Sequence, residues 1–428
     1  MHGRIARRLA ALASVTALLS SCGAFTGDDG DVVTLDFWCW GDLQSDRVDA
    51  FNASHPDIQV RRTDVGGGDD TATKLLTASR AGNGPDVACL EYQTVPAMVV
   101  SDVLADIADE VGPLTDEFTE ETWQLTDFEG HVYGVPDDTG PMVLLYNKAR
   151  FDELGLDVPE TWEEFAEVAE QARAADPRTY MATFAPSEFG NFAGLAQQAG
   201  ATWWEVEDRH WTIGFDDEPS MRVARYWQDL IDRDLVSAEP LLTPEWNARV
   251  NRGEVLTWPS GLWSPSVIYS IAENQAGDWA IAPLPHWEGD PYTVALQGGS
   301  ALCVTRNSDE VDAAVEFLTW MATSPESIEV QLTGGQYPAS LRGQAAAAES
   351  PPPTLTGNQE DYWEVATEAA AHTVPHIQWG PNVTTANDAF SDAFSAAIRD
   401  HTPLTDALRR TQEEVVGEME RVGYHVSG

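Results

Sequence analysis

The segment YGVPDDTGPMVLLYN, residues 133–147, begins apolar, is interrupted between Pro136 and Pro141, and then becomes apolar again. A second segment, WAIAPLPHWEGDPYTVALQGGSALCVTR at 279–306, has the same form and is interrupted at Pro283 and Pro285. Apolar runs bounded by Pro and Gly are typical of extended strands. Each segment is either a β-hairpin or a pair of strands that leave one domain and enter another. The choice between these alternatives decides the fold.

Strand-like and helix-like patterns alternate along the rest of the chain. VVTLDFW (32–38) and PDVACLEY (85–92) have the composition of buried strands, whereas TATKLLTASRAG (71–82) places apolar residues at helical spacing. A further helix is predicted from Thr161, where Glu164 completes a capping-box pattern. Strands that alternate with helices predict α/β domains with largely parallel sheets.

The charge of the chain excludes several classes of ligand. The formal net charge is −46, from 70 acidic and 24 basic residues. Nucleic-acid binding needs clusters of Lys and Arg against the phosphates, and the sequence contains no such cluster. The field of the whole protein would also repel a strongly anionic ligand. Because 43% of the 428 residues are hydrophobic and 16 are Trp, the chain can bury substantial cores, and its length predicts two or three domain-sized units.

The N-terminal segment has the pattern of an export signal. Three arginines precede an apolar run at residues 9–19 that is too short to span a bilayer. The run ends in Leu-Ser-Ser-Cys, which resembles a bacterial lipoprotein box in which Cys22 becomes the lipidated N-terminus. Residues 1–21 are therefore expected to be the signal peptide, and residues 22–31 a tether to the membrane. An ordinary secretory signal with a chance cysteine is the alternative.

The remaining cysteines do not have the spacing of a metal site. Cys39, Cys89 and Cys303 follow Cys22, and no Cys-x-x-Cys or Cys/His pattern occurs. Because Cys39 and Cys89 both lie in strand-like segments of an exported protein, they are candidates for a disulfide. The sequence also lacks a phosphate-binding loop, a zinc-protease motif and a calcium loop, so no metal or cofactor is expected.

The segment GHVYGVPDDTGPMVLLYNKARFDELGLDVPETWEEF (130–165) resembles the core signature of the extracytoplasmic sugar-binding proteins of ABC importers, the family that includes maltose-binding protein. Further segments resemble the family in the same order along the chain: FNASHPDIQV (51–60), AGNGPDVACLEY (81–92), GLWSPS (261–266), WAIAPLP (279–285), GGSALCVTRNSDEVDAAVEFLTWMATSPES (298–327) and NDAFSDAFSAAIRDHTPLTDALRRTQEEV (387–415). The resemblance covers nearly the whole chain after the signal. The segment at 336–353 matches poorly, so the identity of the sugar does not follow.

The resemblance implies a two-lobed periplasmic-binding-protein-like α/β fold, with hinge strands and a ligand cleft between the lobes. The chain would cross between the lobes near Pro136–Asp138, near Pro283, and a third time after Gly334–Gly335. The expected boundaries are residues 32–136 plus 284–335 for lobe 1 and residues 137–283 plus 336–428 for lobe 2.

Trp40 and Asp42 directly follow the predicted strand at 32–38, and in open α/β sheets ligands bind beyond the carboxyl ends of strands. A sugar offers C–H-rich faces and a rim of hydroxyl groups, so it is suited by aromatic rings and by carboxylates that accept hydrogen bonds. Glu91 follows another predicted strand and Asp138 lies in the segment PDDTG, and the resemblance implies that both occupy positions where the family often has cleft residues, with Asp138 preferred to Asp137 on that ground only. All four are therefore predicted to bind the ligand, although any of the acids could instead be a solvated surface group.

Five further ligand-binding candidates follow, of which the resemblance gives the first three. Trp263 in GLWSPS occupies the position where the family commonly has a Trp, and it is the best single candidate. Gly298 and Gly299 resemble a Gly pair that lets backbone amides approach the ligand, although a simple turn would also explain them. Trp204 and Trp379 either line the cleft or belong to the core.

The predicted function is that of a monomeric receptor, lipid-anchored through Cys22 to the outer face of the bacterial cell membrane. It would capture a neutral sugar or oligosaccharide and deliver it to the permease of an ABC importer. The alternative is a secreted carbohydrate-active enzyme similar to a glycoside hydrolase, in which Glu91 and Asp138 would be the paired carboxylates. The lipoprotein signal and the ordered family segments favour binding without catalysis, and no nucleophile motif is present.

Overall fold

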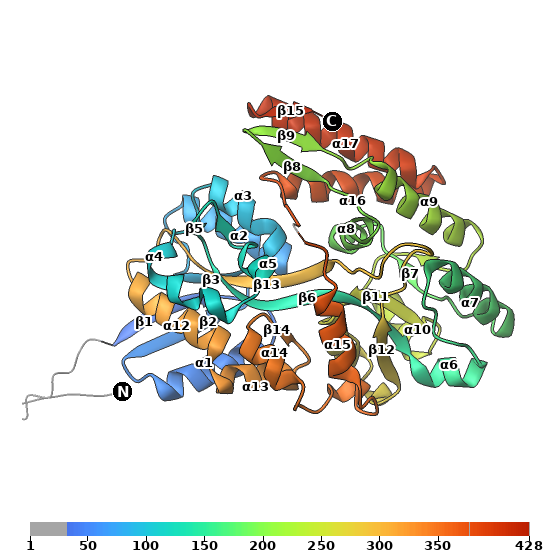
Figure 1. Cartoon of the computed structure of the whole chain (residues 1–428), viewed down its shortest axis with the longest axis horizontal. Coiled ribbons are helices and arrows are strands. Elements are labelled where there is room, and N and C mark those ends of the chain that lie inside the picture. Colours follow the sequence, from blue (N-terminus) through green and yellow to red (C-terminus); the bar gives the residue numbers. More distant parts are fainter. Residues whose placement is uncertain (1–31, 376, 428) are drawn as a thin grey trace, which may run out of the picture.

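The computed structural model describes residues 32–375 and 377–427. Figure 1 shows two lobes side by side, with strands that run from one lobe into the other. The predicted signal peptide, the tether and Cys22 lie outside the described residues.

The elements alternate between strand and helix, as the sequence predicts. The part before the first inter-lobe strand contains β1 (Val33–Trp38), α1 (Leu43–Ser54), β2 (Ile58–Thr63), α2 (Gly68–Arg80), β3 (Val87–Glu91), η1 (Tyr92–Thr94), α3 (Val95–Val100), α4 (Ala108–Val111), η2 (Gly112–Glu117), α5 (Glu120–Trp123), β4 (Asp127–Phe128) and β5 (His131–Val132). After β6 (Val135–Asn147) come α6 (Lys148–Leu154), α7 (Trp162–Ala175), β7 (Thr183–Phe184), α8 (Phe189–Gln198), β8 (Trp204–Glu207), β9 (His210–Ile213), α9 (Glu218–Asp232), β10 (Ser237–Ala238), α10 (Pro244–Asn251), β11 (Thr257–Gly261), α11 (Ser264–Ile271), η3 (Glu273–Gln275) and β12 (Trp279–Pro283). The remaining elements are β13 (Leu296–Val304), α12 (Val311–Thr323), α13 (Pro325–Thr333), β14 (Tyr337–Pro338), α14 (Leu341–Ala347), η4 (Thr354–Thr356), α15 (Tyr362–Ala371), α16 (Val383–Asp400), α17 (Leu404–Arg421) and β15 (His425–Ser427).

The capping box predicted for α7 is confirmed. Thr161 precedes the helix, and its hydroxyl accepts a hydrogen bond from the backbone N–H of Glu164 at 3.1 Å. The Glu164 carboxylate accepts in return from the backbone N–H of Glu160 at 2.8 Å. The first bond satisfies a donor that the first turn of a helix would otherwise leave free, and the second ties the residue before the cap to the helix.

The strand β6 decides between the two alternatives for the segment 133–147. Its first half pairs with β13 and β14, and its second half pairs with β11 and β12. It is therefore one continuous strand that passes from the sheet of one lobe into that of the other, and not a hairpin. The two apolar runs of 279–306 likewise form separate strands, because β12 pairs with β6 in the second lobe and β13 pairs with β3 in the first.

The expectation of largely parallel sheets is wrong for most of the sheet. The path of the eight-stranded sheet is β11-β6-β13-β3-β1-β2, with β12 and β14 added to β6. Within this sheet β1 is parallel to β2 and β3, but β13 is antiparallel to both β3 and β6. The strands that connect the lobes run back and forth, and neighbouring strands of opposite direction pair as antiparallel.

Each lobe has its own hydrophobic core. The second half of β6, Met142–Leu145, packs in one large cluster with residues of α7, α8, α9, α16 and α17. The first lobe has two clusters, one on each face of its sheet, because alternate residues of a strand point to opposite faces. Leu302 and Val304 of β13 belong to one of these clusters, and Ala301 and Cys303 belong to the other. The exact residue boundaries of the lobes stay a prediction.

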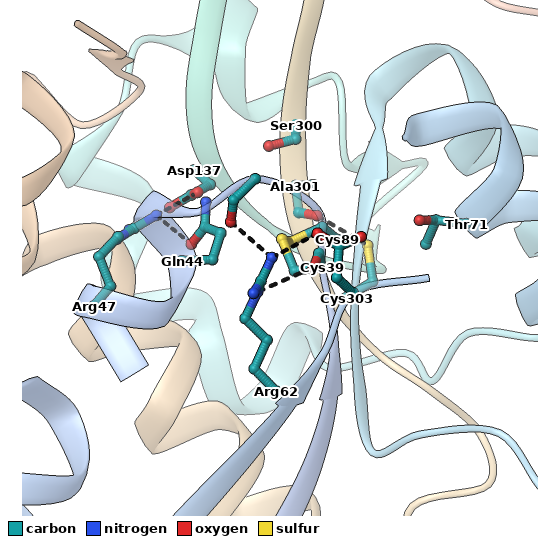
Figure 2. Close-up of a disulfide and its surroundings, with 12 residues drawn as sticks. Cys39, Gln44, Arg47, Arg62, Thr71, Cys89, Asp137, Ser300, Ala301 and Cys303 are labelled. Atoms are coloured by element: carbon teal, nitrogen blue, oxygen red, sulfur yellow. Dashed lines mark hydrogen bonds and ion pairs between the residues drawn. A yellow bond between two sulfur atoms is a disulfide. The ribbon is translucent and has the colours of Figure 1, made fainter. Parts of the chain in front are cut away.

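A buried ion pair fixes the start of β6 to the first lobe. Arg47 of α1 is fully buried, and its Nη1 and Nη2 donate to Asp137 Oδ2 and Oδ1 at 2.8 and 2.7 Å, respectively (Figure 2). The Arg47 Nε also donates to the Ser327 hydroxyl at 2.7 Å, and the Gln331 amide donates to the Asp137 carbonyl at 3.1 Å. A two-point arginine–carboxylate bond of this kind restricts orientation as well as distance. The network therefore holds the first hinge residue in place.

Candidate functional site

A small cavity between the lobes has walls from both of them. Its lining consists of Glu91, Tyr92, Gln93 and Leu125 from the first lobe, Leu296 and Gly298 from β13, and Trp379 from the second lobe. The volume is ≈ 10 Å³, which is about the space that one water molecule requires. The lobes therefore lie close together here, and they would have to move apart to admit a sugar ring.

Glu91 forms the first-lobe wall of this small cavity. It is the last residue of β3, and its Oε2 accepts a hydrogen bond from Gln93 Nε2 at 2.8 Å. Its carboxyl group also lies against the first turn of α2, since a Cβ on Gly68 would be 2.5 Å from Glu91 Oε1. The absence of a side chain at Gly68 permits this approach, and the N-terminus of a helix favours a negative charge. Glu91 is thus a positioned acceptor at the edge of the cleft.

Trp379 forms the opposite wall, and its ring rests on other aromatic residues. Its side chain is 9% exposed, and its ring centroid lies 6.2 Å from that of Phe189 and 6.0 Å from that of Trp204. Trp204 itself is 0% exposed, and its Nε1 donates to Asn382 Oδ1 at 3.2 Å. In this structure the ring of Trp204 is enclosed by the core of the second lobe, which is one of the two alternatives that the sequence left open, and its contact with a ligand stays a prediction.

Trp263 lies next to the small cavity through Gly298. Its Nε1 donates to the backbone oxygen of Gln297 at 2.8 Å, and its ring packs edge-on against Trp258 at 5.4 Å. A Cβ on Gly298 would be 3.0 Å from Trp263 Nε1, and the φ of Gly298 is +73°. The position therefore requires Gly both for its backbone conformation and for the approach of the indole. The side chain of Trp263 remains half-buried.

Asp138 lies within the hinge and does not line the small cavity. Its Oδ1 accepts a hydrogen bond from the Ser300 hydroxyl of β13 at 2.5 Å, and its backbone oxygen accepts from the Tyr92 hydroxyl at 2.9 Å. Burial, and next the charge of Asp137, raise the pKa of Asp138 to about 6, against the lowering effects of the Ser300 bond and Arg47. The adjacent acids thus differ, because Asp137 has the arginine partner and Asp138 has a hydroxyl.

Gly299 lets β6 and β13 approach each other at the hinge. Its φ is +84°, and a Cβ there would be 2.9 Å from Tyr92 Cε2 and 3.1 Å from the backbone oxygen of Asp138. The register of β13 against β6 also shifts between Leu296 and Gly299. In this structure Gly299 therefore serves the packing of the hinge strands.

Trp40 and Asp42 follow β1, but neither lines the small cavity. Trp40 is partly buried against the core of the first lobe. Asp42 is exposed at the start of α1 and makes no capping hydrogen bond. Between them, the backbone oxygen of Gly41 accepts from Arg62 Nη2 at 2.7 Å, and this bond fixes the turn. Their predicted contact with a ligand stays a prediction.

A disulfide joins the segments that carry Trp40 and Glu91. Cys39 and Cys89 are bonded in the structure, with Cα atoms 5.0 Å apart, and Figure 2 shows Arg62 beside them. The bond therefore ties the end of β1 to β3 at the cleft side of the sheet. Cys303 is free and buried, and burial raises the pKa of its thiol.

Sequence reasoning missed several residues of the small cavity. Tyr92 and Gln93 directly follow Glu91, so the cue that identified Glu91, its place after a strand, could also have found them. Leu125 and Leu296 are ordinary apolar residues with no distinguishing pattern. Their place between the lobes depends on the path of β6 and β13.

A second inter-lobe cavity of ≈ 520 Å³ adjoins the first, and Leu125 and Leu296 line both cavities. Its first-lobe wall includes Thr122 of α5, and its second-lobe wall includes Thr367 of α15. Over the ranges described, no cluster of three or more His, Cys, Asp or Glu side chains could hold a metal ion. No helix in the same ranges is long and apolar enough to cross a membrane.

Several solved structures have the same fold. The galacto-N-biose-/lacto-N-biose I-binding protein of the ABC transporter from Bifidobacterium longum has a TM-score of 0.82 at 27% identity, over 94% of this chain and 100% of that chain. The ABC transporter-associated binding protein of B. animalis subsp. lactis Bl-04, in complex with β-1,6-galactobiose, has a TM-score of 0.85 at 24% identity, over 93% and 100% of the two chains. The predicted two-lobed periplasmic-binding fold is confirmed.

Curated relatives match over nearly their full length. The arabinooligosaccharide-binding protein of Halalkalibacterium halodurans is 26% identical over 415 residues, which are 92% of each chain. The lactose-binding protein of Rhizobium radiobacter is 25% identical over 97% of this chain and 98% of that protein. A family model for bacterial extracellular solute-binding proteins matches residues 43–327. Since that match covers more than half of the sequence, the chain belongs to the family of bacterial extracellular solute-binding proteins.

Proposed function

We propose that this protein captures a neutral sugar or short oligosaccharide between its lobes and delivers it to the permease of an ABC importer. The observation that carries the proposal is the small cavity in which Glu91 and Gln93 of one lobe face Trp379 of the other. A ligand that enters between these walls when the lobes are apart contacts both lobes, so it favours an arrangement closed around it over an open one. A permease can then distinguish the loaded receptor from the empty receptor.

The chemistry of the small cavity suits a sugar. Trp379 supplies an aromatic face, and Glu91 and Gln93 supply planar polar groups that accept or donate hydrogen bonds to hydroxyls. Among the residues that the structure describes, no Lys, Arg or His lines this cavity, so the described lining offers a phosphorylated ligand no counter-charge. Two relatives that match over more than nine-tenths of this chain are named for sugars, namely arabinooligosaccharides and lactose.

A hydrolase is the less favoured function. Paired carboxylates act from opposite sides of a glycosidic bond that lies between them. Here Glu91 lines the small cavity, whereas the Asp138 carboxyl group is buried in the hinge and bonded to Ser300. The two acids therefore do not face a common space in this arrangement. We infer binding without catalysis.

The place of the protein in the cell follows from its family and its N-terminal pattern. The family is extracellular. The lipoprotein-like sequence before Cys22 supports a lipid anchor at the outer face of the membrane, and we propose that the receptor acts there as a monomer.

The test is a calorimetric titration of the purified chain with lactose, β-1,6-galactobiose, lacto-N-biose and an arabinooligosaccharide. Mass spectrometry of the sugar after each titration detects cleavage. We expect saturable binding with unchanged sugar. Trp263→Ala and Trp379→Ala should each weaken binding by at least about tenfold, about 1.4 kcal/mol. Because Trp379 is largely buried, its replacement should also lower the melting temperature, so binding is measured well below that temperature.

Trp211→Ala is the matched control, because Trp211 lies in β9 and lines neither inter-lobe cavity. Its affinity should equal that of the unmodified chain. Cleaved sugar would establish the hydrolase. Equal affinities for all three variants would show that the site lies elsewhere.

A further inference from the structure

A third cavity lies on the second lobe, outside the space between the lobes. Its volume is ≈ 740 Å³, larger than that of either inter-lobe cavity. It is formed by the end of β6, the start of α6, the strand β12 and one face of α15, which lie close together in Figure 1. We call it the outer pocket.

The helix α15 separates the outer pocket from the inter-lobe cavity of ≈ 520 Å³. Val365 and Glu368 face the outer pocket, whereas Thr367, Ala370 and Ala371 face the inter-lobe cavity. This division follows from the helical period, because residues three or four apart share a face. The two cavities share no lining residue, so each can be occupied or disabled separately.

Aromatic rings form part of the wall of the outer pocket. Tyr292 is in contact with His372 and His286, with ring centroids 5.1 and 6.2 Å apart, respectively. Tyr146 lines the pocket from the end of β6. These rings provide flat, weakly polar surfaces of the kind against which the C–H faces of a sugar pack.

Polar side chains also line the outer pocket. Glu160, Asp361 and Glu368 are exposed acids of this lining, so their carboxylates can accept hydrogen bonds from water or from a ligand, and Tyr146 adds a hydroxyl. Lys148 is the one Lys or Arg among the described residues of the lining, and it is paired with Asp152 at 2.6 Å. The pocket thus offers more acceptors than positive charges, which favours a neutral ligand over a phosphate or a uronate.

We propose that the outer pocket is a second binding site, for a neutral mono- or disaccharide. Its volume lies within the range of about 300–1,000 Å³ that is usual for small-ligand sites, and it combines an apolar floor with a few polar groups. Hydroxyl groups of the ligand would donate to Glu368, Asp361 and Glu160, and Tyr146 and Tyr292 would contact its C–H faces. The proposal does not depend on the inter-lobe site.

The experiment uses the purified chain with Trp263→Ala and Trp379→Ala, which disable the inter-lobe site. Ligand-observed NMR and calorimetry with lactose, β-1,6-galactobiose and lacto-N-biose, up to about 10 mM, measure the remaining affinity. We expect saturable binding of at least one of these sugars. Adding Tyr146→Phe and Glu368→Ala, which remove one hydroxyl and one carboxylate, should weaken it by at least about fivefold.

Glu364→Ala is the matched control, because Glu364 is an exposed acid of the same helix that does not line the outer pocket. It should leave this affinity unchanged. Absence of saturable binding up to that concentration, or equal loss with Glu364→Ala, would overturn the proposal. The outcomes also separate the two sites. If Trp263→Ala and Trp379→Ala abolish all binding, only the inter-lobe site binds sugar. If only Tyr146→Phe and Glu368→Ala weaken binding, the outer pocket alone binds it.

Discussion

The substitution Asp138→Asn tests the electrostatics of the hinge. Asp138 is buried, and its carboxyl group has the Ser300 hydroxyl as its hydrogen-bond donor, while Arg47 is engaged by Asp137. Asn has the same shape and keeps an oxygen that can accept from Ser300, but it carries no charge. The substitution therefore isolates the cost of ionising a buried acid beside a second acid.

The magnitude follows from the pKa of Asp138. Its pKa is raised from 3.8 to about 6 in the folded protein, and one pKa unit corresponds to about 1.4 kcal/mol, so ionisation costs about 3 kcal/mol of stability. Since the folded-state pKa is the higher one, this stability is present below the unfolded-state pKa and is lost as the pH rises through about 6. The free energy of unfolding of Asp138→Asn, relative to that of the unmodified chain, should thus rise by about 2–3 kcal/mol between about pH 4 and about pH 8.

The assay is urea unfolding of both proteins at the two pH values, followed by circular dichroism. Taking the difference in free energy of unfolding between the two proteins removes the contribution of the other acids, which titrate in both. Asp42→Asn is the control, because Asp42 is exposed and makes no capping bond, and its effect should be the same at both pH values. A change with pH of less than about 0.5 kcal/mol for Asp138→Asn, or a gain at the lower pH instead, would refute the reasoning.

Three further predictions concern stability. Arg47→Met leaves the buried Asp137 carboxylate without its partner and should lower the free energy of unfolding, measured in urea, by about 3–5 kcal/mol. Adding Asp137→Leu should recover most of this loss, because no unpaired charge then remains buried. If the double variant recovered nothing, Arg47 would not act by pairing with Asp137. Joint replacement of Cys39 and Cys89 by Ser opens a link of sequence separation 50 and should cost about 2–4 kcal/mol, which reduction of the unmodified chain should reproduce. Gly299→Ala should lower the melting temperature through about 1–3 kcal/mol of strain, because its φ is +84°, and an unchanged melting temperature would show that the hinge adjusts freely.

Sequence patterns were sufficient for the class of the fold and for part of the site. Apolar runs interrupted by Pro and Gly identified the inter-lobe strands as one of two alternatives, because strand formation depends on local composition. The place of Glu91 after a strand predicted its position at the cleft edge, because strand ends converge there. The family resemblance identified Gly298, which lines the same cavity, and Trp379, for which the sequence left cleft and core open, lines it as well.

Tertiary structure decided the remaining features. Trp204 and Trp379 are both aromatic residues of the second lobe, yet one is enclosed by the core and the other lines the small cavity, and no local pattern separates them. Asp137 and Asp138 are chemically identical neighbours. Successive side chains of a strand point to opposite faces, so one acid meets Arg47 and the other meets Ser300.

The sequence by itself determined what each segment can form, because propensity and apolar spacing are local properties of the chain. It did not determine which distant segments meet. The pairing of Arg47 with Asp137, the crossing of β6 between two cores, and the division of α15 between two cavities all depend on contacts between residues far apart in the chain. Such contacts form only when the lobes pack, since packing brings together groups whose separation in sequence carries no information about their separation in space.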